Sequence, residues 1–438
     1  MLFSSNTFLF GFLPAVVVLY YLCPRRCRNV LLLVSSLIFY GWGEPKYVLL
    51  MLVSILLNYF CGLAAGKRQK QQRSVRGVLI VGVVLNLGML GFFKYGKFFF
   101  GSAFPDIPLP IGISFYIFQA MSYLIDVCRR EVEVQKNVLT FGTYVTLFPQ
   151  LIAGPIVRYR DVAEMLESRR ENLPQFSRGV QRFVVGLSKK VLLANTFGSA
   201  WNALQVTTGT AAAWLGLLCY TLQIYFDFSG YSDMAIGLGQ LFGFTFLENF
   251  NYPYISASIT EFWRRWHISL STWFKEYVYI PLGGNRKGLA RQIFNILVVW
   301  LLTGLWHGAS WNFVLWGGYY AALLILEKCW LLKAGEKLPL LLRRMLTMVL
   351  VMLGWALFYF EDLGALGAFL GRLFTAVPSA GIAFYLPVTA LGCLCATPAM
   401  KRVKLPDAVR WGLCVVLLLL CVASLARQSY NPFIYFRF

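Results

Sequence analysis

The sequence predicts an all-α protein that crosses a lipid bilayer several times. Hydrophobic residues make up 58% of the 438 residues, whereas Asp, Glu, Lys and Arg together make up only 13%. Soluble domains contain roughly 45–50% apolar and about 25% charged residues. Runs without a charged residue also recur at the length of a membrane-spanning helix, which needs about 20 apolar residues. These runs are residues 2–24, 29–43, 47–66, 77–93, 107–125, 191–226, 292–326, 345–360, 373–400 and 411–426.

The number of crossings depends on how these runs are divided. Splitting the two longest runs gives about ten to thirteen crossings, and we expect some of them to be re-entrant. No linker, internal repeat or low-complexity tract stands out, so the sequence predicts one integral-membrane domain over residues 1–438. Residues 2–24 lack a preceding basic segment and a small-residue cleavage site, which favours a retained first span over a signal peptide.

Two segments interrupt the pattern of apolar helices with proline and glycine. They are Pro108–Phe115 and Phe148–Pro155, and the second lies between two basic clusters, so it should enter and leave the membrane on one side. Broken backbone at membrane depth is tolerated only where it is packed in protein or lines a water-filled cavity. Both segments therefore favour an internal cavity.

The net charge of +21 is spread over short basic clusters between the apolar runs. The first clusters follow alternate spans, as the positive-inside rule requires of cytoplasmic loops, and this places the N-terminus outside the cytoplasm. This distribution argues against nucleic acid as a partner and favours topology signals and contacts with lipid headgroups. The first three clusters are Arg25 to Arg28, Lys67 to Arg76, and Arg129 with Arg130.

The ten cysteines are scattered through apolar segments and include no Cys-x-x-Cys pair. Cys23 and Cys27 flank a basic turn that we expect to face the cytoplasm, where disulfides are disfavoured. We therefore expect neither a metal site nor a disulfide framework.

The only two histidines of the chain each follow a tryptophan inside a polar stretch of this apolar sequence. His267 lies within Glu261–Ser269, and His307 lies within Thr303–Trp311. Histidine has the unperturbed pKa closest to neutrality, which makes it the natural proton acceptor for chemistry at pH 7. Both histidines are therefore candidate catalytic residues.

His307 lies in residues 292–326, a run without Asp, Glu, Lys or Arg. As a helix, the part of the run before His307 rises about 22 Å, less than the roughly 30 Å apolar core of a bilayer. An ionisable group inside that core is costly to desolvate and marks a candidate functional site. Gly304 and Gly308 should open room beside it. The alternative is a structural histidine that forms a hydrogen bond between helices.

The region around His267 predicts an amphipathic helix at the cytoplasmic surface. The capping-box pattern from Ser258 to Glu261 predicts a helix that begins near Ile259, and we expect it to end before Pro281. Residues at positions i, i+3, i+4 and i+7 of that helix should share one face. These residues are Trp263, Trp266, His267 and Leu270.

Basic residues flank His267 on this predicted helix and in the loop after it. Arg264 and Arg265 follow Glu261 at i+3 and i+4, a spacing that permits a local ion pair. The loop could hold the phosphates of a coenzyme A thioester, but the same residues are equally consistent with a topology signal. They are Arg286, Lys287 and Arg291.

The motifs that are absent from the sequence narrow the chemistry. There is no Gly-x-Ser-x-Gly elbow for a serine nucleophile, no His-Glu-x-x-His zinc motif and no Walker-type loop. Direct transfer is then the simplest reaction, in which a base deprotonates a hydroxyl as it attacks a thioester carbonyl. His307 would be that base, and Trp306 and Trp311 would wall the cavity and exclude water.

Several long motifs resemble those of the membrane-bound O-acyltransferase family, and in particular its bacterial members that acetylate polysaccharides such as alginate. The resemblance spans nearly the whole chain and is densest from about residue 107 to 326. The motifs that carry it are Ile111–Phe115, Phe148–Ile156, Gln223–Asp233, Asn249–Tyr254, Arg264–Phe274, Tyr279–Arg286, Leu302–Ala309 and Tyr430–Phe436.

The resemblance implies a fold and a set of site residues. The fold would be a ring of about eleven transmembrane helices, with re-entrant and interfacial helices, around a central tunnel. The essential histidine of the family matches His307, and its second histidine motif matches His267. The acyl donor would be acetyl-CoA, with no bound cofactor and no metal. Donor binding would fall to Arg264, Arg265, Arg286, Lys287 and Arg291, and the tunnel lining to Trp306, Trp311 and Asn312.

The resemblance also implies partners and a location. The acceptor would be an exported polysaccharide or a cell-wall polymer, and a separate extracytoplasmic acetyltransferase would complete the transfer. The protein would lie in the bacterial inner membrane and cross it several times. Two alternatives stay open at this point: transfer of another acyl group, such as D-alanine to a wall polymer, and a transporter that moves lipid or polysaccharide through the same cavity.

Overall fold

The computed structural model describes residues 1–151, 154–403, 405–427 and 433. All regular secondary structure in these residues is helical, which confirms the predicted all-α class. The chain forms two compact units, which divide the long helix α12 (Thr210–Leu241) between them. The first unit holds residues 1–187, 231–248 and 425–432, and the second holds residues 188–230, 249–424 and 433–438. A single integral-membrane domain over the whole chain stays a prediction.

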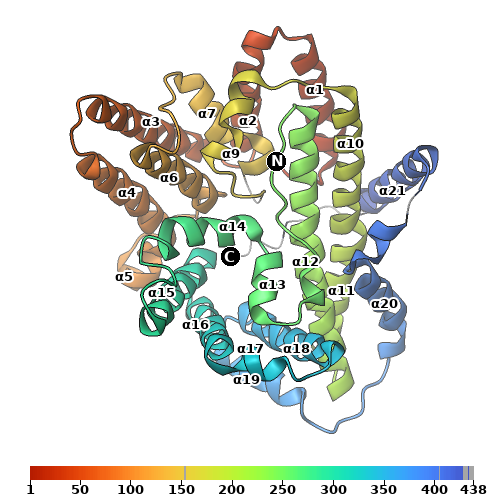
Figure 1. The fold of residues 1–438 in the computed structure, drawn as a ribbon. Coiled ribbons are helices and arrows are strands. Elements are labelled where there is room, and N and C mark those ends of the chain that lie inside the picture. The colour runs from red at the N-terminus through yellow and green to blue at the C-terminus, as the bar shows by residue number, and fades with distance from the viewer. Residues whose placement is uncertain (152–153, 404, 428–432, 434–438) are drawn as a thin grey trace. The chain divides into compact units, whose positions relative to one another are not determined.

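The first unit is built from the N-terminal helices, coloured red to yellow in Figure 1. Its α-helices are α1 (Leu13–Leu22), α2 (Arg28–Gly41), α3 (Val48–Lys70), α4 (Arg76–Leu90), α5 (Gly96–Phe100), α6 (Ile113–Arg129), α7 (Val138–Thr146), α8 (Phe148–Leu151), α9 (Tyr159–Ser168) and α10 (Leu173–Ser188). Short π- or 3₁₀-helical turns lie between them at Thr7–Phe12, Arg25–Cys27, Pro45–Tyr47, Gly91–Tyr95 and Gly101–Ala103.

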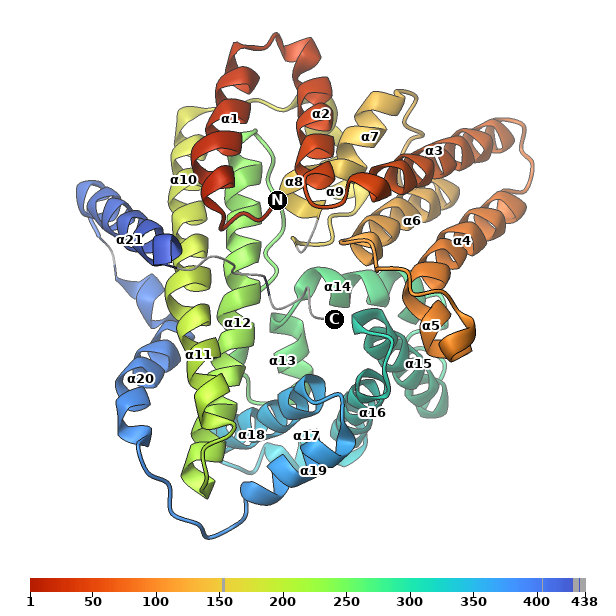
Figure 2. The ribbon, with the colours of Figure 1, turned by 180° about the vertical axis from the view of Figure 1, so that it is seen from behind.

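Helices α3, α4 and α6 lie side by side in the first unit (Figures 1 and 2). A buried pair of amides joins α3 to α4, because Asn58 and Asn86 each donate a hydrogen bond to the other, at 3.0 and 2.8 Å. Gly82 lets α6 approach α4, since a Cβ there would lie 2.1 Å from the Leu124 side chain. Polar pairs and small residues of this kind hold helices together where both sides are apolar.

The two segments interrupted by proline and glycine both lie in the first unit. Gly112 adopts a left-handed conformation, with φ 75°, immediately before α6 begins at Ile113. In the second segment the four residues of α8 are all buried, and the Phe148 amide donates a 3.0 Å hydrogen bond to Ser36 Oγ. The described part of the second segment is therefore packed in protein, while its residues 152–153 lie outside the described residues.

The second unit holds both histidines and is coloured mainly green to blue in Figure 1. Besides part of α12, it contains α11 (Asn195–Leu204), α13 (Ile259–Arg265), α14 (Ile268–Phe274), α15 (Leu289–His307), α16 (Trp311–Leu326), α17 (Leu332–Gly335), α18 (Leu340–Tyr359), α19 (Leu363–Arg372), α20 (Leu386–Cys395) and most of α21 (Asp407–Arg427). It also contains the π-helical turns η6 (Lys189–Ala194), η8 (Lys275–Tyr279) and η9 (Glu327–Leu331), and the 3₁₀ turns η7 (Pro253–Ile255), η10 (Ile382–Tyr385) and η11 (Pro398–Arg402).

Helices α15 and α16 are the most closely packed pair of the second unit (Figures 1 and 2). Their backbones approach at Gly304 and Gly317, whose Cα atoms face each other. A Cβ at Gly304 would lie 2.2 Å from the carbonyl oxygen of Phe313, and one at Gly317 would lie 2.4 Å from that of Trp300. Only glycine fits at such a crossing, where small residues let helix backbones touch. This contact fixes the end of α15, where His307 lies.

Six helical stretches in the described chain are long and apolar enough to cross a bilayer. The chain is therefore a multi-pass membrane protein by its helix lengths and composition. The predicted runs give fewer spans than expected. Residues 191–226 divide among η6, α11 and α12, and only α12 qualifies; residues 373–400 hold one helical stretch of 10–17 residues, Ile382–Cys395. A ring of about eleven helices stays a prediction. The six stretches are Pro45–Lys70, Arg76–Ala103, Thr210–Leu241, Leu289–His307, Leu340–Tyr359 and Asp407–Arg427.

Candidate active site

The predicted continuous helix from Ile259 towards Pro281 is wrong, because the chain breaks at His267. Helix α13 ends at Arg265, Trp266 is extended, and His267 takes the left-handed conformation with φ 45° and ψ 54°. Helix α14 then begins at Ile268. A residue with a Cβ pays roughly 1–3 kcal/mol for such a conformation, so the surrounding contacts must hold it there. His267 therefore does not share a continuous helix face with Trp263 and Trp266.

The predicted start of this helix is confirmed. The Ser258 side chain accepts a 3.0 Å hydrogen bond from the Glu261 amide, and Glu261 Oε2 accepts one of 2.8 Å from the Ala257 amide. Glu261 also forms the local ion pair expected from its spacing, with Arg265 at 2.8 Å. The capping pattern could be found from sequence because all of its contacts are local.

Asn249 holds the break at His267. Asn249 Oδ1 accepts hydrogen bonds from the Ser269 amide at 3.1 Å and from Ser269 Oγ at 2.9 Å, and it lies 3.2 Å from His267 Nδ1. The main-chain oxygen of Asn249 accepts another from the Ile268 amide, at 3.0 Å. Both oxygens of one buried residue thus bind the turn. Sequence reasoning missed Asn249, although it opens the Asn249–Tyr254 motif.

The Asn249 contact also determines the tautomer of His267. A backbone N–H can only donate, so the Asn249 atom that faces Ser269 is the oxygen, and His267 Nδ1 must carry the proton that it shares with that oxygen. His267 Nε2 then has the lone pair, and it has no hydrogen-bond partner among the described residues. Burial lowers the pKa of His267 to about 3, so the ring is neutral at pH 7.

His307 is the last residue of α15 and is buried in an aromatic cage. Its ring lies 5.0 Å from Trp306, 5.0 Å from Trp316 and 5.3 Å from Phe358, measured between centroids, and each pair is close to perpendicular. The glycines beside it do not leave open room as predicted. A Cβ at Gly308 would lie 2.1 Å from the Phe313 ring, so residues of α16 already fill that space.

Both histidines contact the same indole. The ring of Trp306 lies 5.8 Å from that of His267 and 5.0 Å from that of His307. The Phe228 ring packs against another side of His267, with 4.7 Å between the ring centroids and an angle of 88° between the ring planes. The fold therefore brings the two histidine motifs together, although 40 positions separate them in the sequence.

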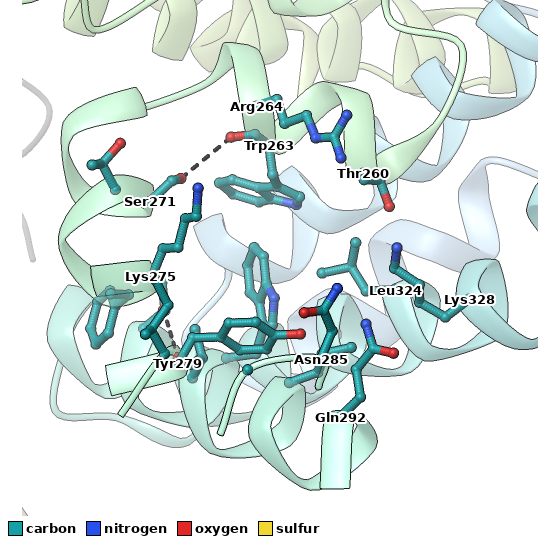
Figure 3. A pocket seen from close by; sticks show the side chains of 18 of the residues that line it. Thr260, Trp263, Arg264, Ser271, Lys275, Tyr279, Asn285, Gln292, Leu324 and Lys328 are labelled. Atoms are coloured by element: carbon teal, nitrogen blue, oxygen red, sulfur yellow. Dashed lines mark hydrogen bonds between the residues drawn. The ribbon is translucent and has the colours of Figure 1, made fainter. Parts of the chain in front are cut away.

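A cavity of about 920 Å³ opens beside His267 within the second unit (Figure 3). Residues of α13, α14, η8, the following loop, α15, α16 and η9 line it. Five of them are basic, and none of the described lining residues is Asp or Glu. The basic residues are Arg264, Lys275, Arg286, Lys287 and Lys328.

A tight loop after η8 brings basic residues to this cavity. Gly283 and Gly284 have φ angles of 112° and 57°, which favour glycine. The buried Asn295 of α15 fixes the loop by donating a 2.9 Å hydrogen bond from Nδ2 to the Gly284 carbonyl. Arg286 and Lys287 follow directly and line the cavity.

The structure separates the five predicted donor-binding residues into two groups. Arg264, Arg286 and Lys287 line the cavity, as does His267. Arg265 instead pairs with Glu261, and Arg291 donates a 2.8 Å hydrogen bond to the Leu282 carbonyl; neither lines it. Two basic lining residues were not predicted from the sequence. They are Lys275 and Lys328, which reach the cavity from η8 and η9.

The three residues predicted to line a tunnel do not line this cavity. Trp306 is buried between the histidines, Trp311 is 66% exposed at the start of α16, and Asn312 is buried and donates a 3.2 Å hydrogen bond to the Phe358 carbonyl. None of the three is among the described residues that line this cavity. In the described part of the chain, no group of three or more His, Cys, Asp or Glu side chains could hold a metal ion.

Comparison with known proteins identifies the family. The model of the membrane-bound O-acyltransferase family matches residues 37–333. The chain belongs to this family. A membrane-bound O-acyltransferase is an enzyme, so membership of this family supports the predicted O-acyltransferase activity. It does not support the transporter alternative.

Relatives that are named as acyltransferases support the same activity. The chain is 41% identical to the probable alginate O-acetylase AlgI of Pseudomonas putida over 486 aligned residues, which cover 100% of both chains. It is 34% identical to the peptidoglycan O-acetyltransferase of Helicobacter pylori, over 83% of this chain and 78% of that one. It is also 30% identical to the teichoic acid D-alanyltransferase of Streptococcus thermophilus, over 51% of this chain and 58% of that one. Within the family, the O-acetylases are thus more similar to this chain than the D-alanyltransferase.

Proposed function

We propose that this O-acyltransferase passes an acetyl group from cytoplasmic acetyl-CoA to a hydroxyl of an extracytoplasmic polysaccharide. One observation carries the proposal: a cavity with five basic and no acidic residues among its described lining also has the buried His267 in that lining. Acetyl-CoA combines phosphates, which basic side chains bind, with a thin arm that ends in the reactive thioester. The basic lining residues and the presence of His267 in the same lining support such a donor.

The charges of the lining residues support a donor with several phosphates. Arg264, Lys275, Arg286, Lys287 and Lys328 form no ion pair within the described residues, so their charges are available to a ligand. Apolar side chains, Trp263 and Trp300 among them, line other parts of the same cavity. A ligand pocket that is mostly apolar, with a few charged groups at defined points, is typical of cofactor-sized substrates.

In this proposal His307 is the general base. It takes the proton of the acceptor hydroxyl as that oxygen attacks the thioester carbon, the carbon–sulfur bond breaks, and the proton passes to the departing thiolate. His267 suits this step less, because burial holds its pKa near 3 and makes it a weak base at pH 7. Its Nε2 lone pair can instead accept a hydrogen bond from the donor or the hydroxyl. Trp306, which contacts both rings, would help to exclude water from the thioester.

The names of the relatives guide the choice of acceptor and partner. Two relatives are named for action on alginate and on peptidoglycan, so we propose a polysaccharide or wall polymer outside the cytoplasm as the acceptor. We also propose a separate extracytoplasmic acetyltransferase for the last step, an inner-membrane location, and a ring of about eleven spans around a tunnel. The name of the more distant D-alanyltransferase makes another acyl group the alternative.

Reconstituted vesicles test this function. Labelled acetyl-CoA is confined to the side of the basic cavity, and acceptor polymer with its partner is placed on the other side. Label should appear on the outer acceptor while free CoA stays on the donor side. Appearance of CoA on the acceptor side would instead indicate a transporter, and labelling from a D-alanyl carrier alone would indicate the alternative donor.

Loss of His307 provides the matched control. His307→Ala should remain folded and membrane-inserted but transfer roughly 10²–10⁴-fold more slowly, the usual cost of losing a general base. His267→Ala should lower the transfer rate less than His307→Ala does. A His307→Ala variant that keeps more than about a tenth of the wild-type rate would contradict the assignment.

A further inference from the structure

Glu327 is a buried acid at the junction of α16 and η9, and its contacts all lead to α13. One carboxylate oxygen accepts a 2.5 Å hydrogen bond from the Ile259 amide. The other accepts hydrogen bonds from the Thr260 amide at 2.8 Å and from Thr260 Oγ1 at 2.7 Å. Glu327 is only 6% exposed. Three donors thus bind one carboxylate over a separation of 67 or 68 residues.

This contact joins two walls of the basic cavity. Thr260 lines the cavity from α13, and Lys328, the residue after Glu327, lines it from η9. Leu324, in the preceding turn of α16, lines it as well. Glu327 itself is not among the lining residues. Its position in a π-helical turn is consistent with a specialised role, since such turns occur frequently at functional sites.

Helix α13 depends on outside contacts for its position. It has seven residues, and isolated helices shorter than roughly 12–15 residues are marginal in water. Its first turn is bound by Glu327 and by the Ser258 cap, and its last residues lead into the strained turn at His267. Trp263 and Arg264 line the cavity from its middle. A shift of α13 would therefore move both the cavity wall and His267.

We infer that Glu327 is a positioning residue for acyl-donor binding, which acts through Thr260 and the first turn of α13. No Lys or Arg pairs with Glu327 among the described residues, so the hydrogen bonds from α13 are what hold the carboxylate. The contact between Glu327 and α13 thus joins the helix that carries Arg264 to the turn that carries Lys328. This inference rests on the proposed use of the cavity for acetyl-CoA.

The first test is a pair of variants at two acidic residues of one segment. Glu327→Gln keeps the size of the side chain but replaces one acceptor oxygen with an NH₂ group, which cannot accept a hydrogen bond from the α13 amide that it faces. Glu336→Gln makes the same change at an exposed residue outside the cavity. Turnover of labelled acetyl-CoA is measured on the purified full chain, per folded molecule. Glu327→Gln should raise KM about ten-fold or more, with a smaller effect on kcat, and Glu336→Gln should match the wild type.

The KM measurement distinguishes positioning from a purely structural role. A structural role would lower the yield of folded protein or its melting temperature and leave KM unchanged, which would overturn the inference. Glu327→Asp, which keeps the charge and both acceptor oxygens, should recover part of the wild-type KM. If Glu327→Gln does not fold, Glu327→Asp and Thr260→Val carry the same KM test.

A double-mutant cycle tests the route through Thr260. Thr260→Val removes one of the three donors and should raise KM on its own. If Glu327 acts through Thr260, the double variant should raise KM by less than the product of the two single effects. A double variant whose KM rises by the full product of the two single effects would refute the idea that Glu327 acts through Thr260. Wild-type protein that does not bind acetyl-CoA at all would refute the proposed function instead, so the two failures are distinguishable.

Discussion

Asn249 Oδ1 lies 3.2 Å from Nδ1 of His267, and both residues are almost fully buried. The same oxygen binds the amide and hydroxyl of Ser269, so one side chain holds the left-handed turn and orients the imidazole. An acceptor at Nδ1 leaves Nε2 as the nitrogen with a lone pair. The relationship makes the position and the tautomer of His267 depend on Asn249.

Replacing Asn249 tests this dependence. Asn249→Ala removes the acceptor and leaves a strained backbone at His267 unsupported, so activity per folded molecule should fall about 10- to 100-fold. Asn249→Asp keeps an acceptor oxygen in place and adds a negative charge, which raises the pKa of His267 from its low value. The aspartate variant should therefore keep more activity than the alanine variant at high pH. Equal activity of the wild type and Asn249→Ala would show that the contact does not matter.

The low pKa of His267 predicts a pH dependence of stability. The pKa is 6.5 for an unperturbed histidine and about 3 here, so between these values the unfolded chain binds a proton that the folded chain does not. The stabilisation is fully present above pH 6.5 and is lost as the pH falls towards 3. Between pH 6.5 and 5.5 the free energy of unfolding should fall by about 1 kcal/mol, and below pH 5.5 by at most about 1.4 kcal/mol per pH unit. Thermal unfolding in detergent at several pH values should show a steeper loss for the wild type than for His267→Gln, and equal slopes would contradict the prediction.

Charge reversal tests the basic loop. Arg286→Glu combined with Lys287→Glu should raise the KM for acetyl-CoA about ten-fold or more and lower kcat less, because phosphate contacts contribute mainly uniform binding. Lys333→Glu with Lys337→Glu makes the same change in charge at exposed residues outside the cavity and should leave KM unaltered. The wild-type KM should also rise with ionic strength. Single cysteines introduced at residues 285–291 should react with an impermeant label from the cytoplasmic face. Labelling from the outer face alone would refute a cytoplasmic cavity mouth.

The sequence predicted local features and missed those that depend on distant contacts. The cap at Ser258 and the ion pair of Glu261 involve neighbours along one helix, and both were predicted. The break at His267 was not, because periodicity from Trp263 to Leu270 favours a continuous helix and the residue that stabilises the break lies 18 positions earlier. Lys328 reaches the cavity only because α16 packs beside α15 and α13, which no local pattern reveals.

The crossing of α15 and α16 predicts that alanine is tolerated at one glycine of this helix pair, Gly318, and not at another, Gly304. Gly304→Ala would place a Cβ 2.2 Å from the Phe313 carbonyl oxygen, a backbone atom that cannot move without shifting α16. A Cβ at Gly318 would meet nothing within 4 Å, so Gly318→Ala is the matched control. Overpacking typically costs about 1–3 kcal/mol. Since Gly304 lies one turn before His307, its substitution should lower both the melting temperature and kcat, whereas Gly318→Ala should change neither. Wild-type melting and turnover in Gly304→Ala would show that the helices do not meet at this glycine.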